Sequence, residues 1–428
     1  MVGVFRDLTG TPMQNSPQKH DPFAAFRHRA FASYAVGNFA SIVGRQMVDV
    51  VVGWEIYQRT HSAAMLGYVG LAAGLPIILL ALPSGHMTDR VSRRGIIMVT
   101  QILTALFSIG LAWVSLAQAP IGWMFLLLFL SSCARTFGWT ARSALVPNLV
   151  ELPEVSNAIT WSSSMFQLGS IVGPALCGLL IAKLGYAPIY LIDAAAQLCF
   201  FASLFFIRVR SDSKKTHVPE GIAELFTGVR FVFKSRIVLA TITLDLFAVL
   251  LGGATMLLPV FAKDILHCGP IGLGWLRAAP GFGAIVMGAA VAFLPPMKKP
   301  GAAMLLAVIG FGLATVVFGL SHWFWLSIAM LFLTGAFDTI SVIVRHSLVQ
   351  ILTPDSMRGR VSAVNNVFIG SSNEIGAFES GMTAAWFGPV ASVVGGGIGT
   401  VLVVLAVALA WPEVRKIGAL HEQKPEEI

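Results

Sequence analysis

Carboxyl groups inside apolar stretches are the residues of this chain best placed to do chemistry. Glu374 and Asp338 fall near the middle of two such stretches, and Asp49 lies in the middle-to-outer part of the first one. A carboxyl group held away from water and without a partner favours its neutral form, so it can bind and release a proton. These three residues are therefore candidates for proton coupling, with Glu374 the first choice. In the alternative, Glu374 has only a structural role.

Other charges in such stretches could neutralise a ligand or one of these carboxyl groups. Arg45 precedes Asp49 by four residues, which puts both on one face of a helix, where they can pair. Arg135 and Asp245 interrupt two further apolar stretches. A charge at mid-bilayer costs at least about 2.5 kcal/mol on insertion scales, so it normally faces a protein interior or a wet cavity. Arg45, Arg135 and Asp245 are thus candidate cavity charges, although Arg45 and Asp49 could instead form a self-neutralising structural pair.

The elements that position these charges follow from the composition. The chain has 428 residues, of which 56% are hydrophobic and 12% are charged, whereas soluble domains carry about 25% charged residues. A spanning helix needs about 20 apolar residues, so there is room for about a dozen spans. The sequence predicts an all-α membrane protein with twelve transmembrane helices. Its apolar runs cover residues 31–57, 62–84, 95–117, 121–146, 157–182, 187–207, 237–262, 271–295, 301–320, 323–349, 361–387 and 390–411.

The basic residues between the runs predict the orientation. If the amino terminus is cytoplasmic, the Lys and Arg residues of the loops gather on the cytoplasmic side, and only Arg59, Lys183 and Lys263 lie outside. This asymmetry follows the positive-inside rule. We therefore expect a multi-pass membrane protein with both termini in the cytoplasm. The formal net charge of +8 needs no nucleic acid to explain it.

The chain also contains an internal repeat. Residues 141–185 can be laid on residues 344–388 with a two-residue insertion, which places Arg142 over Arg345. Parallel repeats of six helices are common in secondary carriers, so we expect two pseudo-symmetric six-helix bundles. Because the repeat puts both arginines near cytoplasmic helix ends, we expect them to snorkel or to pair with loop acids. The predicted divisions are a cytoplasmic tail at 1–28, a bundle at 29–207, a cytoplasmic linker at 208–236, a bundle at 237–411 and a tail at 412–428.

A charged loop stands between the second and third runs. Its pattern, G-x-x-x-D-R-x-x-R-R, resembles the signature loop of the major facilitator superfamily, which implies the twelve-helix fold of that superfamily. Such a loop would act as a cytoplasmic gate, because an acid near a helix start and bases beyond it can hold two halves together. In the alternative it is only a solvated, positively charged loop. The matching loop of the second half, Pro295 to Gly301, has no such acid. The motif residues are Gly85, Asp89, Arg90, Arg93 and Arg94.

The fifth run carries a second motif, G-x-x-x-G-P-x-x-x-G, which is formed by Gly169, Gly173, Pro174 and Gly178. It resembles the motif of antiporter-type exporters in the same superfamily. Its glycines leave a stripe without side chains, along which a neighbouring helix can approach, and simple small-residue packing is the alternative. The eleventh run, SSNEIGAFESGMTAAWFG, is similar to the carrier branch that includes enterobactin and macrolide exporters.

The resemblance implies a secondary active carrier of the bacterial inner membrane that works by alternating access. The expected activity is proton-coupled efflux, by a monomer, of an amphipathic small molecule such as a siderophore, drug or metabolite. A lysolipid flippase or an uptake carrier on the same scaffold is the alternative. The partners would be the small molecule, protons and the lipid bilayer. Because no Walker, H-E-x-x-H or G-x-S-x-G motif occurs and the four cysteines lack metal-ligand spacing, we expect no enzyme, cofactor or metal site.

Overall fold

The computed structural model describes residues 21–207, 222–295, 297–354 and 357–418. Within this part of the chain the regular structure is helical and no strand is found. The prediction of an all-α fold is therefore confirmed. Twelve of the described helices have 16 residues or more, in agreement with the predicted number of long helices. They are α1 (Arg29–Thr60), α2 (Ala63–Arg90), α3 (Arg93–Leu116), α4 (Ile121–Leu145), α5 (Val155–Leu184), α6 (Ala187–Phe205), α8 (Arg236–Leu251), α10 (Gly269–Phe293), α11 (Pro300–Leu320), α12 (Phe324–Leu352), α13 (Arg358–Phe387) and α14 (Pro389–Ala410).

Shorter helices connect or flank these elements. The helix that begins as α8 is interrupted at Gly252 and Gly253 and continues as three short pieces. α7 lies inside the stretch predicted as a linker, where it packs on the second set of helices through buried Phe231 and Val232. The predicted linker therefore contains a helix, and its residues 208–221 lie outside the described part. The short elements are η1 (Ala24–Arg27), η2 (Val146–Asn148), η3 (Leu152–Glu154), α7 (Ile222–Lys234), η4 (Ala254–Leu257), α9 (Leu258–Val260), η5 (Phe261–Ile265) and α15 (Pro412–Lys416).

Hydropathy separates two of the long helices from the others. In the described part of the chain, ten helices are long and apolar enough to cross a membrane. α1 and α13 are not among them, although they have 32 and 30 residues. These two helices carry Arg45, Asp49 and Glu374, so half of the six candidate charges lie on the most polar long helices of the fold.

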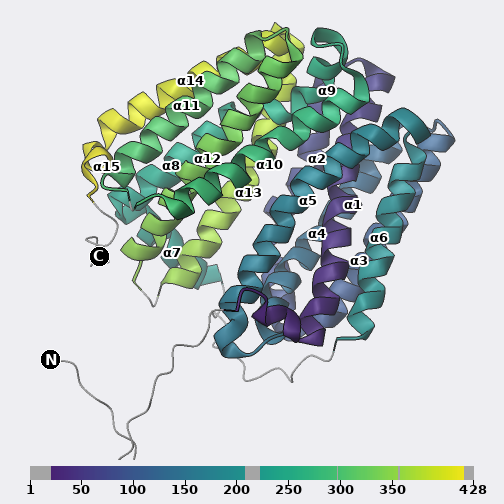
Figure 1. Cartoon of the computed structure of the whole chain (residues 1–428), viewed down its shortest axis with the longest axis horizontal. Coiled ribbons are helices and arrows are strands. Elements are labelled where there is room, and N and C mark those ends of the chain that lie inside the picture. Colours follow the sequence, from purple (N-terminus) through teal and green to yellow (C-terminus); the bar gives the residue numbers. More distant parts are fainter. Residues whose placement is uncertain (1–20, 208–221, 296, 355–356, 419–428) are drawn as a thin grey trace, which may run out of the picture.

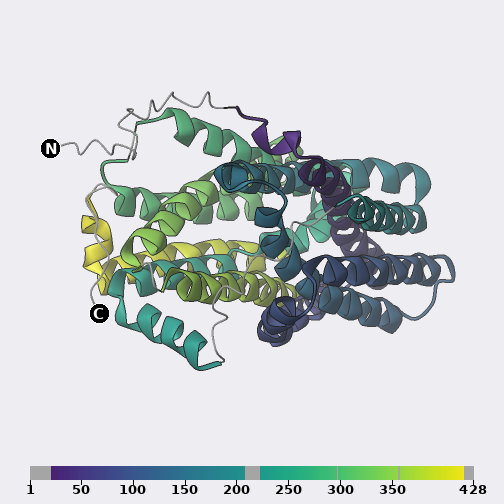
Figure 2. The same cartoon turned by 90° about the horizontal axis from the view of Figure 1, so that it is seen from below.

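The helices form two groups that lie side by side (Figures 1 and 2). In the first half, α1 packs on α5 and α6, α2 on α4, and α3 on α4 and α6. In the second half, α10 and α11 pack on α12, α11 also on α14, and α8 on α13 and α14. The halves meet through two extensive helix pairs, α2 with α13 and α5 with α10. These four helices therefore make most of the contact between the halves, and a movement of one half against the other must change how they pack.

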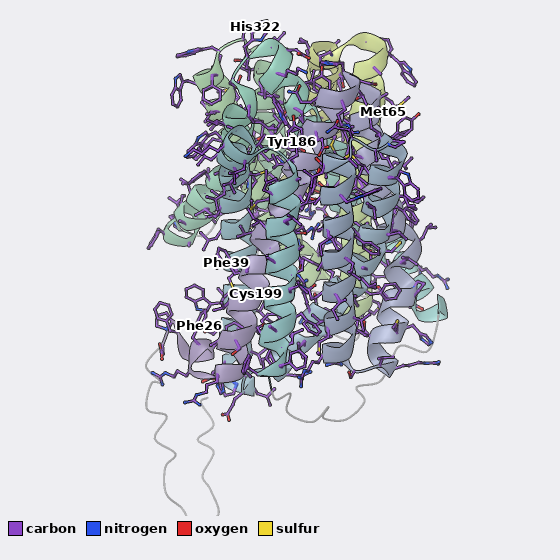
Figure 3. All side chains as sticks on the ribbon, turned by 90° about the vertical axis from the view of Figure 1, so that its right-hand side faces the viewer. Phe26, Phe39, Met65, Tyr186, Cys199 and His322 are labelled. Atoms are coloured by element: carbon purple, nitrogen blue, oxygen red, sulfur yellow. The ribbon has the colours of Figure 1, made fainter. Side chains whose placement is uncertain are left out.

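Close contact between the halves is made at one end of the molecule. Met65 and His322 lie at this end, here named the α9 end, and Phe26 lies at the other, named the α7 end (Figure 3). Near the α9 end, a Cβ on Gly381 of α13 would come within 2.4 Å of the Gly67 Cα of α2. Near the α7 end of α2, by contrast, a Cβ on Gly85 would meet nothing within 4 Å. The structure is thus closed at the α9 end.

Polar contacts reinforce this closure. Tyr57, in the last turn of α1, donates a hydrogen bond to Asp264 of η5. Lys263 Nζ donates to Gln58 Oε1 at 2.7 Å and lies 3.3 Å from His61 Nδ1. All of these contacts join the first half to the second.

The glycines of the fifth-run motif face two different neighbours. Gly173 lies against Gln46 and Val43 of α1, inside the first half. A Cβ on Gly178 would lie 3.0 Å from the Gly274 Cα of α10, in the second half. The motif therefore packs α5 on both sides, and its glycines allow close approach within the first half and between the halves.

Candidate functional site

Charged side chains from both halves gather between the two groups of helices. Asp49 Oδ2 lies 3.8 Å from Arg45 Nε, and Asp49 Oδ1 lies 3.5 Å from Arg135 Nη1. The sequence spacing predicted the first pair, and the fold adds Arg135 from α4. The site is named here the charge cluster, and its members are Arg45, Asp49, Arg135, Arg277 and Glu374.

Glu374 joins the cluster from the second half. The charges of Arg135, Asp49, Arg45 and Arg277 all act on its carboxylate. It can lie there because α2 has no side chain at Gly74, where a Cβ would come within 2.2 Å of the Glu374 Cβ. Glu374 is therefore held at the contact of α2 with α13, where the two halves meet.

Arg277 of α10 is a member of the cluster that sequence reasoning missed. The charges of Asp49 and Glu374 act on it. Its Nη1 also donates a hydrogen bond of 2.9 Å to the Thr255 carbonyl of η4, next to the interruption after α8. The signal was present in the sequence, because Arg277 is a single arginine inside the apolar run 271–295.

Two other candidate acids lie apart from the cluster. Asp338 of α12 is accessible, and no other charge of the described residues acts on it. Asp245 of α8 forms an ion pair with Arg345 of α12, and both side chains are buried inside the second half. Arg345 therefore does not snorkel or pair with a loop acid as expected, because an acid on a neighbouring helix is closer.

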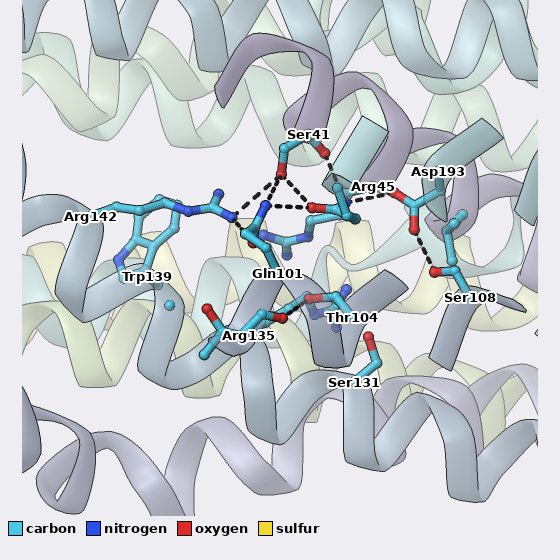
Figure 4. Close-up of a pocket in the computed structure, with 14 residues that line it drawn as sticks. Ser41, Arg45, Gln101, Thr104, Ser108, Ser131, Arg135, Trp139, Arg142 and Asp193 are labelled. Atoms are coloured by element: carbon cyan, nitrogen blue, oxygen red, sulfur yellow. Dashed lines mark hydrogen bonds between the residues drawn. The ribbon is translucent and has the colours of Figure 1, made fainter. Parts of the chain in front are cut away.

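A chain of hydrogen bonds runs through the first half beside the cluster (Figure 4). Arg142 Nη2 donates to Gln101 Oε1 at 2.7 Å, and Gln101 Nε2 donates to Gln197 Oε1 at 2.8 Å. Gln197 Nε2 donates to Asp193 Oδ1 at 2.7 Å, and Ser108 Oγ donates to Asp193 Oδ2 at 2.5 Å. Arg142 thus contacts a buried glutamine, whereas snorkelling or a pair with a loop acid was expected. This set, named the polar network, consists of Ser41, Gln101, Ser108, Arg142, Asp193 and Gln197.

The polar network borders a cavity of about 40 Å³ between α1, α3, α4 and α6. A polar cavity needs roughly 10–15 Å³ of such space for one water molecule, so this one has room for a few. Arg45 and Arg135 line it together with Asp193. Because both arginines also belong to the charge cluster, the cavity connects the two sets of residues. Sequence reasoning missed Asp193, although it is an acid inside the apolar run 187–207.

The signature loop is described only in part. α2 ends at Arg90, and Ser92 caps α3 by accepting a hydrogen bond of 3.1 Å from the Gly95 amide. Arg93 Nη1 donates to the Ala144 carbonyl at 3.0 Å, which ties the start of α3 to the end of α4. The side chain of Asp89 lies outside the described residues, so its part in a gate stays a prediction.

No group of three or more His, Cys, Asp or Glu side chains that could hold a metal ion is found among the residues that the structure describes. The site is built from guanidinium, carboxyl, amide and hydroxyl groups. Such groups can bind protons and polar parts of a small molecule.

Comparison with known proteins relates this arrangement to a family. The family described as "Transmembrane secretion effector" matches residues 20–425. The enterobactin exporter EntS of Shigella boydii serotype 4 is 26% identical over 390 residues, which cover 91% of this chain and 93% of the relative. EntS of Citrobacter koseri is 27% identical over the same shares.

Solved structures of transporters share the fold. A POT family transporter in complex with 5-aminolevulinic acid has a TM-score of 0.73 and 11% identity, and covers 90% of this chain and 96% of its own. A bacterial homologue of the human lysosomal transporter Spinster, inward-facing and occupied, has a TM-score of 0.72 and 14% identity, with 92% and 99% covered. With a family match over nearly the whole length, the chain belongs to the transmembrane secretion effector family of the major facilitator superfamily and is a transporter, not an enzyme.

Proposed function

We propose that this protein exports a siderophore or a similar amphipathic small molecule across the bacterial inner membrane in exchange for protons. The observation that carries the proposal is the charge cluster, to which both halves contribute and which contains Glu374. The names of the relatives support efflux and suggest the class of cargo, because these enterobactin exporters align over 91% of the chain.

The charge balance of the cluster supports a coupling role for Glu374. The charges of three guanidinium groups act on two carboxylates, one from each half. A charge interacts more strongly in a low-dielectric interior than in water, so neutralising Glu374 changes both the attraction between the halves and the field that a cargo meets. Protonation of one group can then act on both cargo binding and closure.

The accompanying movement would be a rocking of the bundle 29–207 against the bundle 237–411. The α9 end, closed in this structure, would face the outside, and the α7 end would face the cytoplasm. Basic residues at the α7 end, such as Arg90, Arg93 and Arg94 where α2 ends and α3 begins, support this orientation. Asp338 and Asp49 remain further candidates for the transported proton, and Asp89 for the cytoplasmic gate.

The test is a transport assay in proteoliposomes with an imposed pH gradient. Enterobactin and a macrolide serve as cargo probes, and a fluorescent lysolipid tests the alternative activity. Wild type should accumulate one of the first two in an uncoupler-sensitive way. Glu374→Gln keeps the size of the side chain but cannot titrate, so it should be present at normal amount and fail to accumulate cargo against its gradient.

The matched control is Glu413→Gln, which removes an exposed carboxylate of α15 next to Arg236 and should transport as wild type does. If Glu374→Gln still accumulates cargo in an uncoupler-sensitive way, Glu374 is not the coupling group. If the protein moves only the lysolipid, the proposed class of cargo is wrong.

A further inference from the structure

Asp193 is a buried acid that the charge cluster does not include. It lies on α6 and is 3% exposed. α1 has no side chain at Gly44, where a Cβ would come within 2.7 Å of Asp193 Oδ1. An ionisable group at this depth is costly, so its presence calls for a partner or a function.

The hydrogen bond to Oδ1 of Asp193 can have only one direction, because the donors along the chain are fixed by Arg142. A guanidinium can only donate, so Arg142 requires Gln101 to accept through Oε1 and to donate through Nε2. Gln101 then requires Gln197 to accept through Oε1, which leaves Gln197 Nε2 to donate to Asp193 Oδ1. The orientation of two amides is therefore set from Arg142, and Asp193 Oδ1 always accepts.

The other oxygen has a partner that can act in both directions. Ser108 Oγ lies 2.5 Å from Asp193 Oδ2. A hydroxyl group can donate to a carboxylate, or rotate and accept from a carboxylic acid. Both protonation states of Asp193 thus keep all the bonds of the network, provided that the proton is carried by Oδ2.

Charged groups from two neighbouring helices face the same region. α1 contributes Arg45 and Asp49, and α4 contributes Arg135 and Arg142, whereas the α3 residues that line the cavity are neutral. Arg135 and Asp49 act on Asp193, and Arg135 also interacts with Asp49 and Glu374. One guanidinium therefore links Asp193 to the charge cluster.

We propose that Asp193 is a second proton-binding site, located in the first half and served by water in the cavity that it lines. Water in the cavity delivers the proton to Oδ2, and the Ser108 hydroxyl rotates from donor to acceptor. No other bond of the network changes. The loss of one negative charge removes a competing partner of Arg135, so Asp49 and Glu374 then determine its position. The role of this shift in transport rests on the function proposed above, whereas the binding of the proton to Asp193 is independent of that function.

Infrared difference spectroscopy on the purified full-length protein in lipid nanodiscs tests this without any cargo. The C=O stretch of a protonated carboxyl group should appear as the pH is lowered. Asp193→Asn preserves the bonds to Gln197 and Ser108 but cannot titrate, so it should remove one band that Glu374→Gln retains. Ser108→Ala leaves the carboxyl group in place and should shift the frequency and the pH midpoint of that same band.

Ser131→Ala is the matched control, because Ser131 lines the same cavity and should leave the band unchanged. Identical titrating bands in wild type, Asp193→Asn and Ser108→Ala would overturn the proposal, as would the absence of any titrating carboxyl band from wild type. If Asp193→Asn does not fold, Ser108→Ala alone decides. The two proposals can fail separately. If the band behaves as expected but the protein accumulates neither siderophore nor macrolide, the proton-binding site is supported and the proposed export is wrong.

Discussion

Arg135 is the residue on which the acids of the site converge. Asp49 from α1, Asp193 from α6 and Glu374 from α13 all act on its guanidinium group. The Arg135 guanidinium interacts with all three carboxylates at once, so a change of charge at any one of them changes the balance of forces that positions it relative to the other two. Arg135 is therefore where events in the two halves can be coupled.

The buried pair of Asp245 and Arg345 yields a prediction about stability. Both residues are almost fully buried, and removing one partner of such a pair leaves an uncompensated charge, which costs about 3–5 kcal/mol. Arg345→Met, which keeps an unbranched apolar side chain but removes the guanidinium, should lower the free energy of unfolding by about this amount. Denaturation of the protein in detergent, followed by tryptophan fluorescence, measures it.

The companion variant is Arg345→Met combined with Asp245→Leu. It removes both charges, so it should recover most of the lost stability. If the single variant is as stable as wild type, the pair has no structural role.

For single residues, the sequence predicted an ion pair within one helix but not the ion pairs between helices. The spacing of Arg45 and Asp49 is enough to place them on one face, and the structure brings them within 3.8 Å. The partner of Arg345 depends on how α8 and α12 are rotated about their axes, which the sequence does not state. Arg277 and Asp193 carry the same signal as the predicted candidates, a charge in an apolar run.

At the scale of elements, the contact of α2 with α13 positions Glu374. The contact is close because glycines on α2 face α13. The long apolar runs predicted the helices themselves, whereas the interruption after α8 and the helix α7 were not predicted. The interruption depends on Gly252 and Gly253 being packed against Phe311 and Gly376, a tertiary contact.

Gly74→Ala should therefore weaken proton coupling. Its Cβ would come within 2.2 Å of the Glu374 Cβ, and overpacking of this kind costs about 1–3 kcal/mol. We expect the variant to reach the membrane at normal amount but to accumulate cargo at least about fivefold less, and the proteoliposome assay measures this.

Gly395→Ala is the control for this helix contact. A Cβ on Gly395 of α14 would meet nothing within 4 Å, so transport should be unchanged. Equal transport by Gly74→Ala and wild type would show that the position of Glu374 does not limit coupling.

At the scale of the whole molecule, the direction of the chain in the membrane is a prediction of its own. Basic residues gather in the loops at one end of the helices, so both termini and the 208–236 linker should lie in the cytoplasm. Reporter fusions at Met1, within the linker and at Ile428 should all report a cytoplasmic location. A periplasmic signal from any one of them would contradict the arrangement in two halves of six helices.

The polarity of α1 and α13 has a consequence for biosynthesis. Each of these polar helices is followed almost at once by an apolar one: His61 and Ser62 separate α1 from α2, and Gly388, with φ of 90°, separates α13 from α14. Charged residues oppose insertion by about 2.5–3.5 kcal/mol each at a helix centre, while apolar side chains favour it. A polar helix can enter the bilayer as one arm of a hairpin whose other arm is apolar. The order in which the ribosome delivers the helices thus supplies α1 and α13 each with an apolar neighbour that favours insertion.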